Sequence, residues 1–165
     1  MELKRVVVTG LGSVSPIGND VPTTWENALN GVSGAGPITH FDASKFKTQF
    51  ACEVKDFDFS KYLDRKEARK CDRYTLLAIA SSEEAIADSN LEFDKLNRDR
   101  IGVIFSAGIG GIKTFEDEVG YYATHEEMGP KFNPFFIPKM ISDIAAGHIS
   151  IRHGLRGPNF GTVSA

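Results

Sequence analysis

Several features that would assign a protein to a special class are absent from this sequence of 165 residues. No apolar run approaches the roughly 18 residues that a transmembrane helix needs, and residues 1–5 lack the layout of a signal peptide. The net charge is only −3, and the chain therefore lacks the positive excess typical of proteins that bind nucleic acid or a membrane surface through charge. We therefore expect a cytoplasmic globular protein, with residues 1–165 belonging to one domain.

Cysteine is also scarce, and the four histidines are scattered along the chain. Cys52 and Cys71 have no metal-ligand spacing and no evident disulfide role, which favours a reducing compartment. Neither has a base or a helix N-terminus that the sequence places beside it, as a nucleophile requires. His148 and His153 are five residues apart on a predicted helix, whereas a helical zinc site uses a spacing of four. The sequence thus predicts no metal site and no cofactor, and it contains no complete catalytic constellation.

The first secondary-structure signal is a β-branched run at residues 5–9, which predicts a buried parallel strand. Gly10 and Gly12 follow it, as in the dinucleotide-binding fingerprint. However, Ser15 occupies the third glycine position and Pro16 comes next, so no helix N-terminus would face a pyrophosphate. A structural turn is favoured, and a nucleotide-binding module stays open as an alternative.

Apolar periodicity and glycine stops divide the rest of the chain into helices and strands. A strand, a buried helix and a second strand that ends in a glycine turn favour an α/β sheet with parallel strands. The predicted helices are 21–31, 72–90 and 139–153, the last ended by Gly154, with an amphipathic segment at 113–127; the predicted strands are 50–54, 100–105 and 159–164.

Residues 132–138 contain two aromatic residues and an isoleucine between two prolines. Pro134 and Pro138 argue against a regular helix here, because proline lacks an N–H and restricts the residue before it. Exposure of this apolar group to water would be costly, so we expect the segment to line a pocket or an interface.

Residues 61–73 form a basic stretch within this acidic chain. They contain six basic and three acidic residues, a difference of +3. Lys66, Arg69, Lys70 and Arg73 follow the i, i+3, i+4, i+7 spacing that puts side chains on one face of a helix. The stretch is either a solvated helix face or a docking patch for an acidic partner.

Residues 155–165 predict a Gly-Pro turn followed by a short strand of small and β-branched residues. A strand of this kind often leads into a tight turn that presents a nucleophile at the N-terminus of a helix. We therefore expect the nucleophile to be the residue that follows Ala165, and we assign no catalytic residue within the chain.

Taken together, these motifs resemble one known family. The motifs are Val6-Val7-Val8-Thr9-Gly10-Leu11-Gly12 with Ser15-Pro16-Ile17-Gly18, Arg65-Lys66-Glu67-Ala68-Arg69-Lys70-Cys71-Asp72, Gly108-Ile109-Gly110-Gly111, Asn133-Pro134-Phe135-Phe136-Ile137-Pro138, Ala146-Gly147-His148 and Gly154-Leu155-Arg156-Gly157-Pro158. In this order, and across the whole chain, they are similar to the N-terminal part of β-ketoacyl-acyl carrier protein synthases of the elongating type II class.

The resemblance implies a thiolase-like α/β fold of two similar halves. This chain would supply most of the first half, with a mostly parallel central sheet and helices on both faces. The implied reaction is a Claisen condensation in which an acyl group on a cysteine thiolate is attacked by decarboxylated malonyl-carrier protein. The family's nucleophile matches the position after Ala165, and none of the four histidines here matches its catalytic pair.

The resemblance also implies roles for individual residues. Lys66, Arg69 and Lys70 resemble the positions that dock the acidic acyl carrier protein. Ile109 resembles a gate residue of the acyl pocket, and Phe135 resembles a pocket-lining residue contributed across a homodimer interface. A non-catalytic partner subunit, like the chain-length factors of polyketide synthases, remains the alternative, and the residue after Ala165 would distinguish the two.

Overall fold

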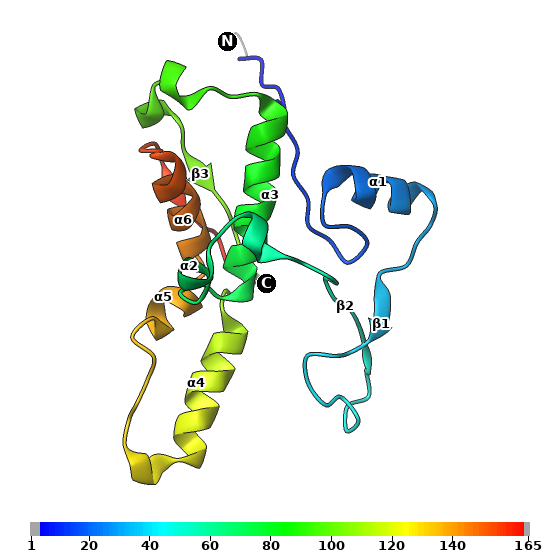
Figure 1. Ribbon diagram of the computed structural model, residues 1–165, viewed down its shortest axis with the longest axis vertical. Coiled ribbons are helices and arrows are strands. Elements are labelled where there is room, and N and C mark those ends of the chain that lie inside the picture. Colours follow the sequence, from blue (N-terminus) through cyan, green and yellow to red (C-terminus); the bar gives the residue numbers. More distant parts are fainter. Residues whose placement is uncertain (1–3, 164–165) are drawn as a thin grey trace. The chain divides into compact units, whose positions relative to one another are not determined.

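The computed structural model describes residues 4–163 (Figure 1). They divide into two compact units. The first contains the residues up to Asp58 together with Ala80–Leu91, and the second contains Phe59–Ile79 together with the residues from Glu92 onward. The long helix α3, Arg73–Ser89, contributes its first part to the second unit and its last part to the first.

In the first unit, the predicted helix at 21–31 is confirmed as α1, Val21–Leu29. Asp20 caps it by accepting a hydrogen bond from the Thr23 N–H at 2.7 Å, and Gly31 leaves the helix at a φ of 65°. The predicted strand at 50–54 is present as β2, Phe50–Cys52, which pairs antiparallel with β1, Ala35–Pro37.

The predicted buried strand at 5–9 is wrong. These residues belong to no strand, and Val6 is 90% exposed. A β-branched run becomes a strand only when a neighbouring strand accepts its hydrogen bonds, and none does so here.

The chain after this run crosses the second part of α3 at very short range. A Cβ on Gly12 would overlap the carbonyl oxygen of Ser81, and one on Gly10 would overlap that of Ala85. The two glycines are therefore accounted for by backbone packing, without a bound nucleotide.

In the second unit, short helices alternate with extended segments. Its elements, besides the first part of α3, are η1 (Phe59–Lys61), α2 (Arg65–Ala68), η2 (Phe93–Lys95), η3 (Arg98–Arg100), β3 (Val103–Ile104), α4 (Ile112–Thr124), η4 (Glu126–Met128), α5 (Phe136–Met140), α6 (Ile144–His153) and β4 (Asn159–Phe160).

Strands β3 and β4 pair in parallel, with Val103 opposite Asn159 and Ile104 opposite Phe160. They confirm the predicted α/β class with a parallel sheet, although each strand is shorter than the 100–105 and 159–164 predicted, and residue 164 lies outside the described residues. Helix α6 lies against both strands, and the Asn159 Nδ2 donates to the carbonyl of Ala146 at 2.9 Å.

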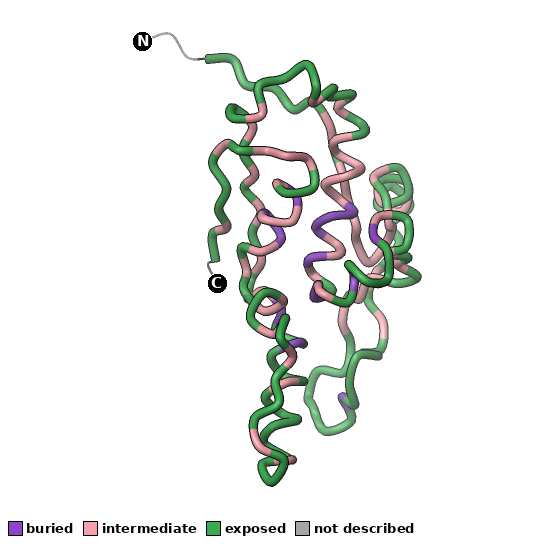
Figure 2. Tube along the Cα trace, turned by 60° about the vertical axis from the view of Figure 1, so that its left-hand side comes forward, coloured by how far each residue is buried: buried purple, intermediate pink, exposed green. Residues whose placement is uncertain are grey.

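The core of the second unit is small. Ala145 and Ala146 on α6 are fully buried, and Leu63, Ala68 and Ile79 form an apolar cluster. Only short stretches of the chain are coloured as buried in Figure 2. Across residues 4–163, none of the helices combines the length and the apolar character that a membrane span requires.

The prolines at 134 and 138 do not prevent helix formation, contrary to the sequence prediction. Helix α5 begins at Phe136 and includes Pro138 in its first turn, where a missing N–H leaves no hydrogen bond unmade. The predicted helix at 139–153 is also divided. Ile141 adopts an extended conformation after α5, and α6 begins only at Ile144 and ends, as predicted, at left-handed Gly154.

Candidate functional site

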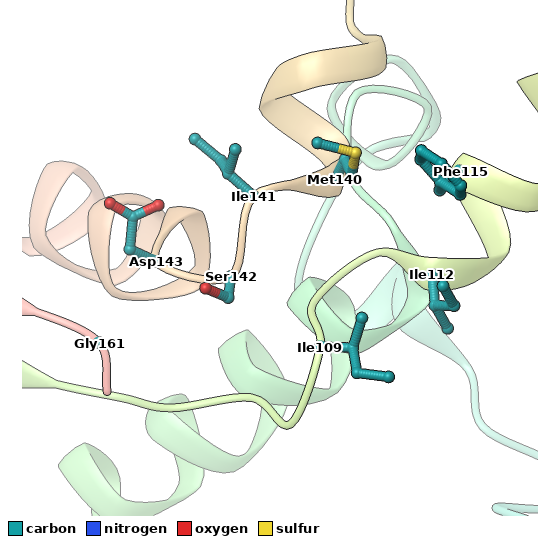
Figure 3. Close-up of a pocket in the computed structure, with 8 residues that line it drawn as sticks. All are labelled: Ile109, Ile112, Phe115, Met140, Ile141, Ser142, Asp143 and Gly161. Atoms are coloured by element: carbon teal, nitrogen blue, oxygen red, sulfur yellow. The ribbon is translucent and has the colours of Figure 1, made fainter. Parts of the chain in front are cut away.

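The second unit contains an apolar pocket with a volume of about 650 Å³ (Figure 3). Its wall comes from the loop before α4, the first turn of α4, the link between α5 and α6, and the segment after β4. The lining residues are Ile109, Ile112, Phe115, Met140, Ile141, Ser142, Asp143 and Gly161. Five of these eight side chains are large and apolar, so the pocket fits an aliphatic group, with Ser142 and Asp143 as its polar end.

Close backbone contacts hold the two main walls of the pocket together. The Gly111 N–H donates to the carbonyl of Met140 at 2.9 Å, and a Cβ on Gly111 would overlap the carbonyl of Lys139. Gly110 has a φ of 91°, which a residue with a side chain rarely adopts. Ile109, directly before this glycine pair, lines the pocket and is 68% exposed.

A buried carboxylate fixes the helix that supplies Ile112 and Phe115. Asp72 is 8% exposed, and its Oδ2 accepts hydrogen bonds from the Thr114 hydroxyl at 2.6 Å and the Thr114 N–H at 3.2 Å. Its Oδ1 accepts from the Tyr74 N–H at 3.2 Å in the first turn of α3. Asp72 was predicted to lie in the basic stretch and at the start of the helix 72–90 and was not identified as a cap, although an aspartate directly before a helix is a typical capping signal.

The basic stretch does not form one helix face, because α2 ends at Ala68 and α3 begins only at Arg73. The chain turns between them, so the predicted i, i+3, i+4, i+7 arrangement of all four cations is wrong. Lys66 and Arg69 are nevertheless exposed, and neither has an ion-pair partner among the described residues.

Phe135 is not among the residues that line this pocket. It lies on the N-terminal side of α5, 40% exposed, and the Lys70 Nζ lies 5.6 Å from the centre of its ring. The structure therefore brings together Lys70 and Phe135, for which the sequence predicted separate roles, and places Ile109 at the pocket.

Cys71 has a base beside it, which the sequence did not reveal. The His148 Nε2 lies 3.8 Å from the Cys71 Sγ. Burial raises the pKa of the Cys71 thiol and lowers the pKa of His148, so both groups favour their neutral forms. The pair is thus a neutral thiol–imidazole contact and not an activated thiolate. No cluster of three or more potential metal ligands occurs within residues 4–163.

Comparison with known proteins gives the family. Residues 3–165 match the model of the β-ketoacyl synthase N-terminal domain. The chain is 46% identical to 3-oxoacyl-[acyl-carrier-protein] synthase 2 of Staphylococcus aureus (strain COL), over 98% of this chain and 39% of that relative.

Solved structures agree with the sequence match. A chain of the complex between a type II polyketide-synthase acyl carrier protein and its ketosynthase has a TM-score of 0.74 and 28% identity, covering 93% of this chain and 40% of that one. A β-ketoacyl synthase from Burkholderia phymatum has a TM-score of 0.79 and 22% identity, covering 99% and 40%. These ketosynthases confirm the thiolase-like fold. The chain spans about two fifths of the length of these proteins, and it belongs to the family of β-ketoacyl synthase N-terminal domains.

Proposed function

We propose that this chain is the N-terminal part of a condensing enzyme of fatty-acid elongation. The enzyme, an acyltransferase, joins an enzyme-bound acyl group to the malonyl group of malonyl-acyl carrier protein, releases CO2 and gives 3-oxoacyl-acyl carrier protein. The observation that carries the proposal is the 46% identity, over nearly the whole chain, to a protein named as a 3-oxoacyl-acyl carrier protein synthase.

The condensation requires a thiolate that first takes the acyl group from its carrier thiol. Loss of CO2 from the malonyl group then leaves an enolate, whose carbon attacks the acyl carbonyl. A carbon–carbon bond forms, the carbon–sulfur bond breaks, and the thiolate is regenerated. We propose that the nucleophile of the full-length protein is the residue that follows Ala165, which is the position that the family's nucleophile matches. No residue of this chain is assigned a proton-transfer role.

The apolar pocket is our candidate site for the acyl chain. Its large side chains would exclude water from an aliphatic group, and we place Ile109, which is 68% exposed, at its entrance. A larger side chain at this position would narrow the entrance, which makes Ile109 the proposed gate.

Three cations, of which Lys66 and Arg69 are exposed and Lys70 is half-buried, are our candidate docking site for the acyl carrier protein. Lys66, Arg69 and Lys70 lie within five consecutive residues around the end of α2. An acidic partner would be steered to such a group over a distance of about one Debye length. The polyketide ketosynthase described above is in complex with an acyl carrier protein, which supports this type of partner.

We further propose a cytoplasmic homodimer in which Phe135 contributes to the pocket of the partner subunit. Its position outside the pocket of its own chain is compatible with that role. Light scattering on the full-length protein measures the subunit number, and a monomer would contradict the proposal.

The decisive experiment is a condensation assay on the full-length protein with acyl- and malonyl-carrier protein. We expect CO2 release and a product two carbons longer, both abolished when the residue after Ala165 is replaced by alanine. If that residue is not cysteine, or if purified protein releases no CO2, the enzyme proposal is wrong. The chain-length-factor alternative is not favoured, because the chain is 46% identical to a 3-oxoacyl-acyl carrier protein synthase and only 24% identical to a chain of a ketosynthase/chain length factor structure.

A further inference from the structure

Lys70 and Phe135 are 65 positions apart in the sequence and in contact in the structure. Lys70 lies in the turn after α2, where its N–H donates to the carbonyl of Glu67 at 2.9 Å. Its ammonium lies 5.6 Å from the centre of the Phe135 ring. Cation–π attraction extends to about 6 Å, so the contact is near the outer limit and a small displacement ends it.

The backbone that carries the ring is held by two hydrogen bonds. The Phe135 N–H donates to the Asn133 Oδ1 at 2.9 Å, and its carbonyl accepts from the Lys139 N–H at 2.9 Å. Phe135 is thus the residue directly before helix α5, which ends at Met140 in the lining of the apolar pocket. One short helix therefore connects the residue beneath Lys70 to the pocket wall.

We propose that Lys70 is a positioning residue that couples carrier-protein docking to Phe135. Without the carrier, its ammonium holds the ring and with it the start of α5. A carboxylate of the docked carrier competes for the same ammonium, because a charge-assisted hydrogen bond is stronger than an exposed cation–π contact. Docking then releases Phe135. This inference rests on the proposed function, in which the carrier protein binds Lys66, Arg69 and Lys70.

Competition for Lys70 predicts the direction in which carrier-protein affinity changes. If the ring and the carrier compete for Lys70, removing the ring makes the ammonium more available, and the carrier binds more tightly. An exposed cation–π contact corresponds to about a two- to five-fold change in affinity. Removing the charge at Lys70 abolishes that gain, since nothing remains to compete for.

The test is a double-mutant cycle on carrier-protein affinity, measured by titration calorimetry on the full-length protein. We expect Phe135→Leu to tighten binding about two- to five-fold in the wild-type background and to leave it unchanged in the Lys70→Met background. In the Lys70→Arg background the gain should return, because arginine also lies on aromatic rings. Lys66→Met is the matched control, since Lys66 does not contact the ring, and the gain should persist there.

Different results would contradict the proposed docking site and the coupling of Lys70 to Phe135. Wild-type protein that binds no carrier protein overturns the proposed docking site and this inference together. Carrier binding with the same Phe135→Leu effect in the Lys70→Met and Lys66→Met backgrounds overturns the coupling alone. A second readout is the ring-current shift of the Lys70 methylene protons in NMR spectra. It should decrease as carrier protein is added, and a shift that stays constant through saturation contradicts the release of Phe135.

Discussion

The contact between Asp72 and Thr114 can be tested with a single nearly isosteric change. Thr114→Val replaces the hydroxyl with a methyl group and keeps the branched shape. Both residues are less than 10% exposed, so water cannot take the place of the lost hydrogen bond without opening the structure. The Thr114 N–H remains as a donor to the Asp72 Oδ2 at 3.2 Å.

The expected loss of stability in Thr114→Val can be worked out from the groups that form the hydrogen bond. A hydrogen bond to a charged group contributes about 1.5–3 kcal/mol, and the added buried methyl group returns about 0.8 kcal/mol. The net loss of local stability is therefore about 1–2 kcal/mol, which corresponds to about a 5- to 30-fold change in an opening equilibrium. The loss falls on the first turn of α4, where Ile112 and Phe115 line the pocket.

Hydrogen exchange of the full-length protein, followed by mass spectrometry on peptides of α4, measures this opening directly. We expect exchange in the first turn of α4 to accelerate by the factor above. The matched control is Thr124→Val at the other end of the same helix, where the exposed hydroxyl donates to the carbonyls of Gly120 and Tyr121 and lies 3.0 Å from the His125 Nδ1. The reasoning fails if Thr114→Val exchanges like wild type, or if the control accelerates the first turn equally.

Three further predictions concern the proposed docking cations, the proposed gate and the buried Cys71. Reversing the charges of Arg69 and Lys70 to glutamate should weaken carrier-protein binding about ten-fold at low salt and less as salt is added. Unchanged affinity at low salt would assign these cations to a solvated surface. Ile109→Phe should lower kcat/KM for long acyl chains by at least about ten-fold and spare short ones, and an unaltered chain-length profile would remove Ile109 from the entrance. Because burial raises the pKa of the Cys71 thiol, its thiolate fraction stays low to higher pH than normal. Iodoacetamide at pH 8 should therefore alkylate Cys71 more slowly than exposed Cys52, and equal rates contradict this.

Local signals in the sequence were sufficient for much of the fold. Gly31 follows the end of α1 and Gly154 ends α6, because left-handed glycines act within a few residues, whereas the Asp20 cap of α1 was not predicted. The apolar middle of α3 also predicted a buried helix, and Ile79 is buried there. The family resemblance then supplied the fold class, which no single element specifies.

What the sequence did not reveal depends on residues far apart in the chain or on the exact start of a helix. Residues 5–9 have strand character but no strand partner, and pairing cannot be read from one segment. Pro138 is compatible with a helix only because α5 begins two residues before it. The approach of His148 to Cys71 depends on the packing of α6, which periodicity does not encode. The site residues assigned by resemblance stay predictions until the experiments above are done.

Glu84 on the second part of α3 has a consequence for the order of folding. Its two carboxylate oxygens accept hydrogen bonds from the backbone N–H groups of Ser13, at 2.8 Å, and Val21, at 2.7 Å. These partners precede it by 71 and 63 residues, and the entropic cost of closing loops of this length must be met before the bonds form. During synthesis, the N-terminal segment therefore has no partner on α3 until about half of this chain has been made. In this unit the first residues to be translated are among the last to reach their native contacts.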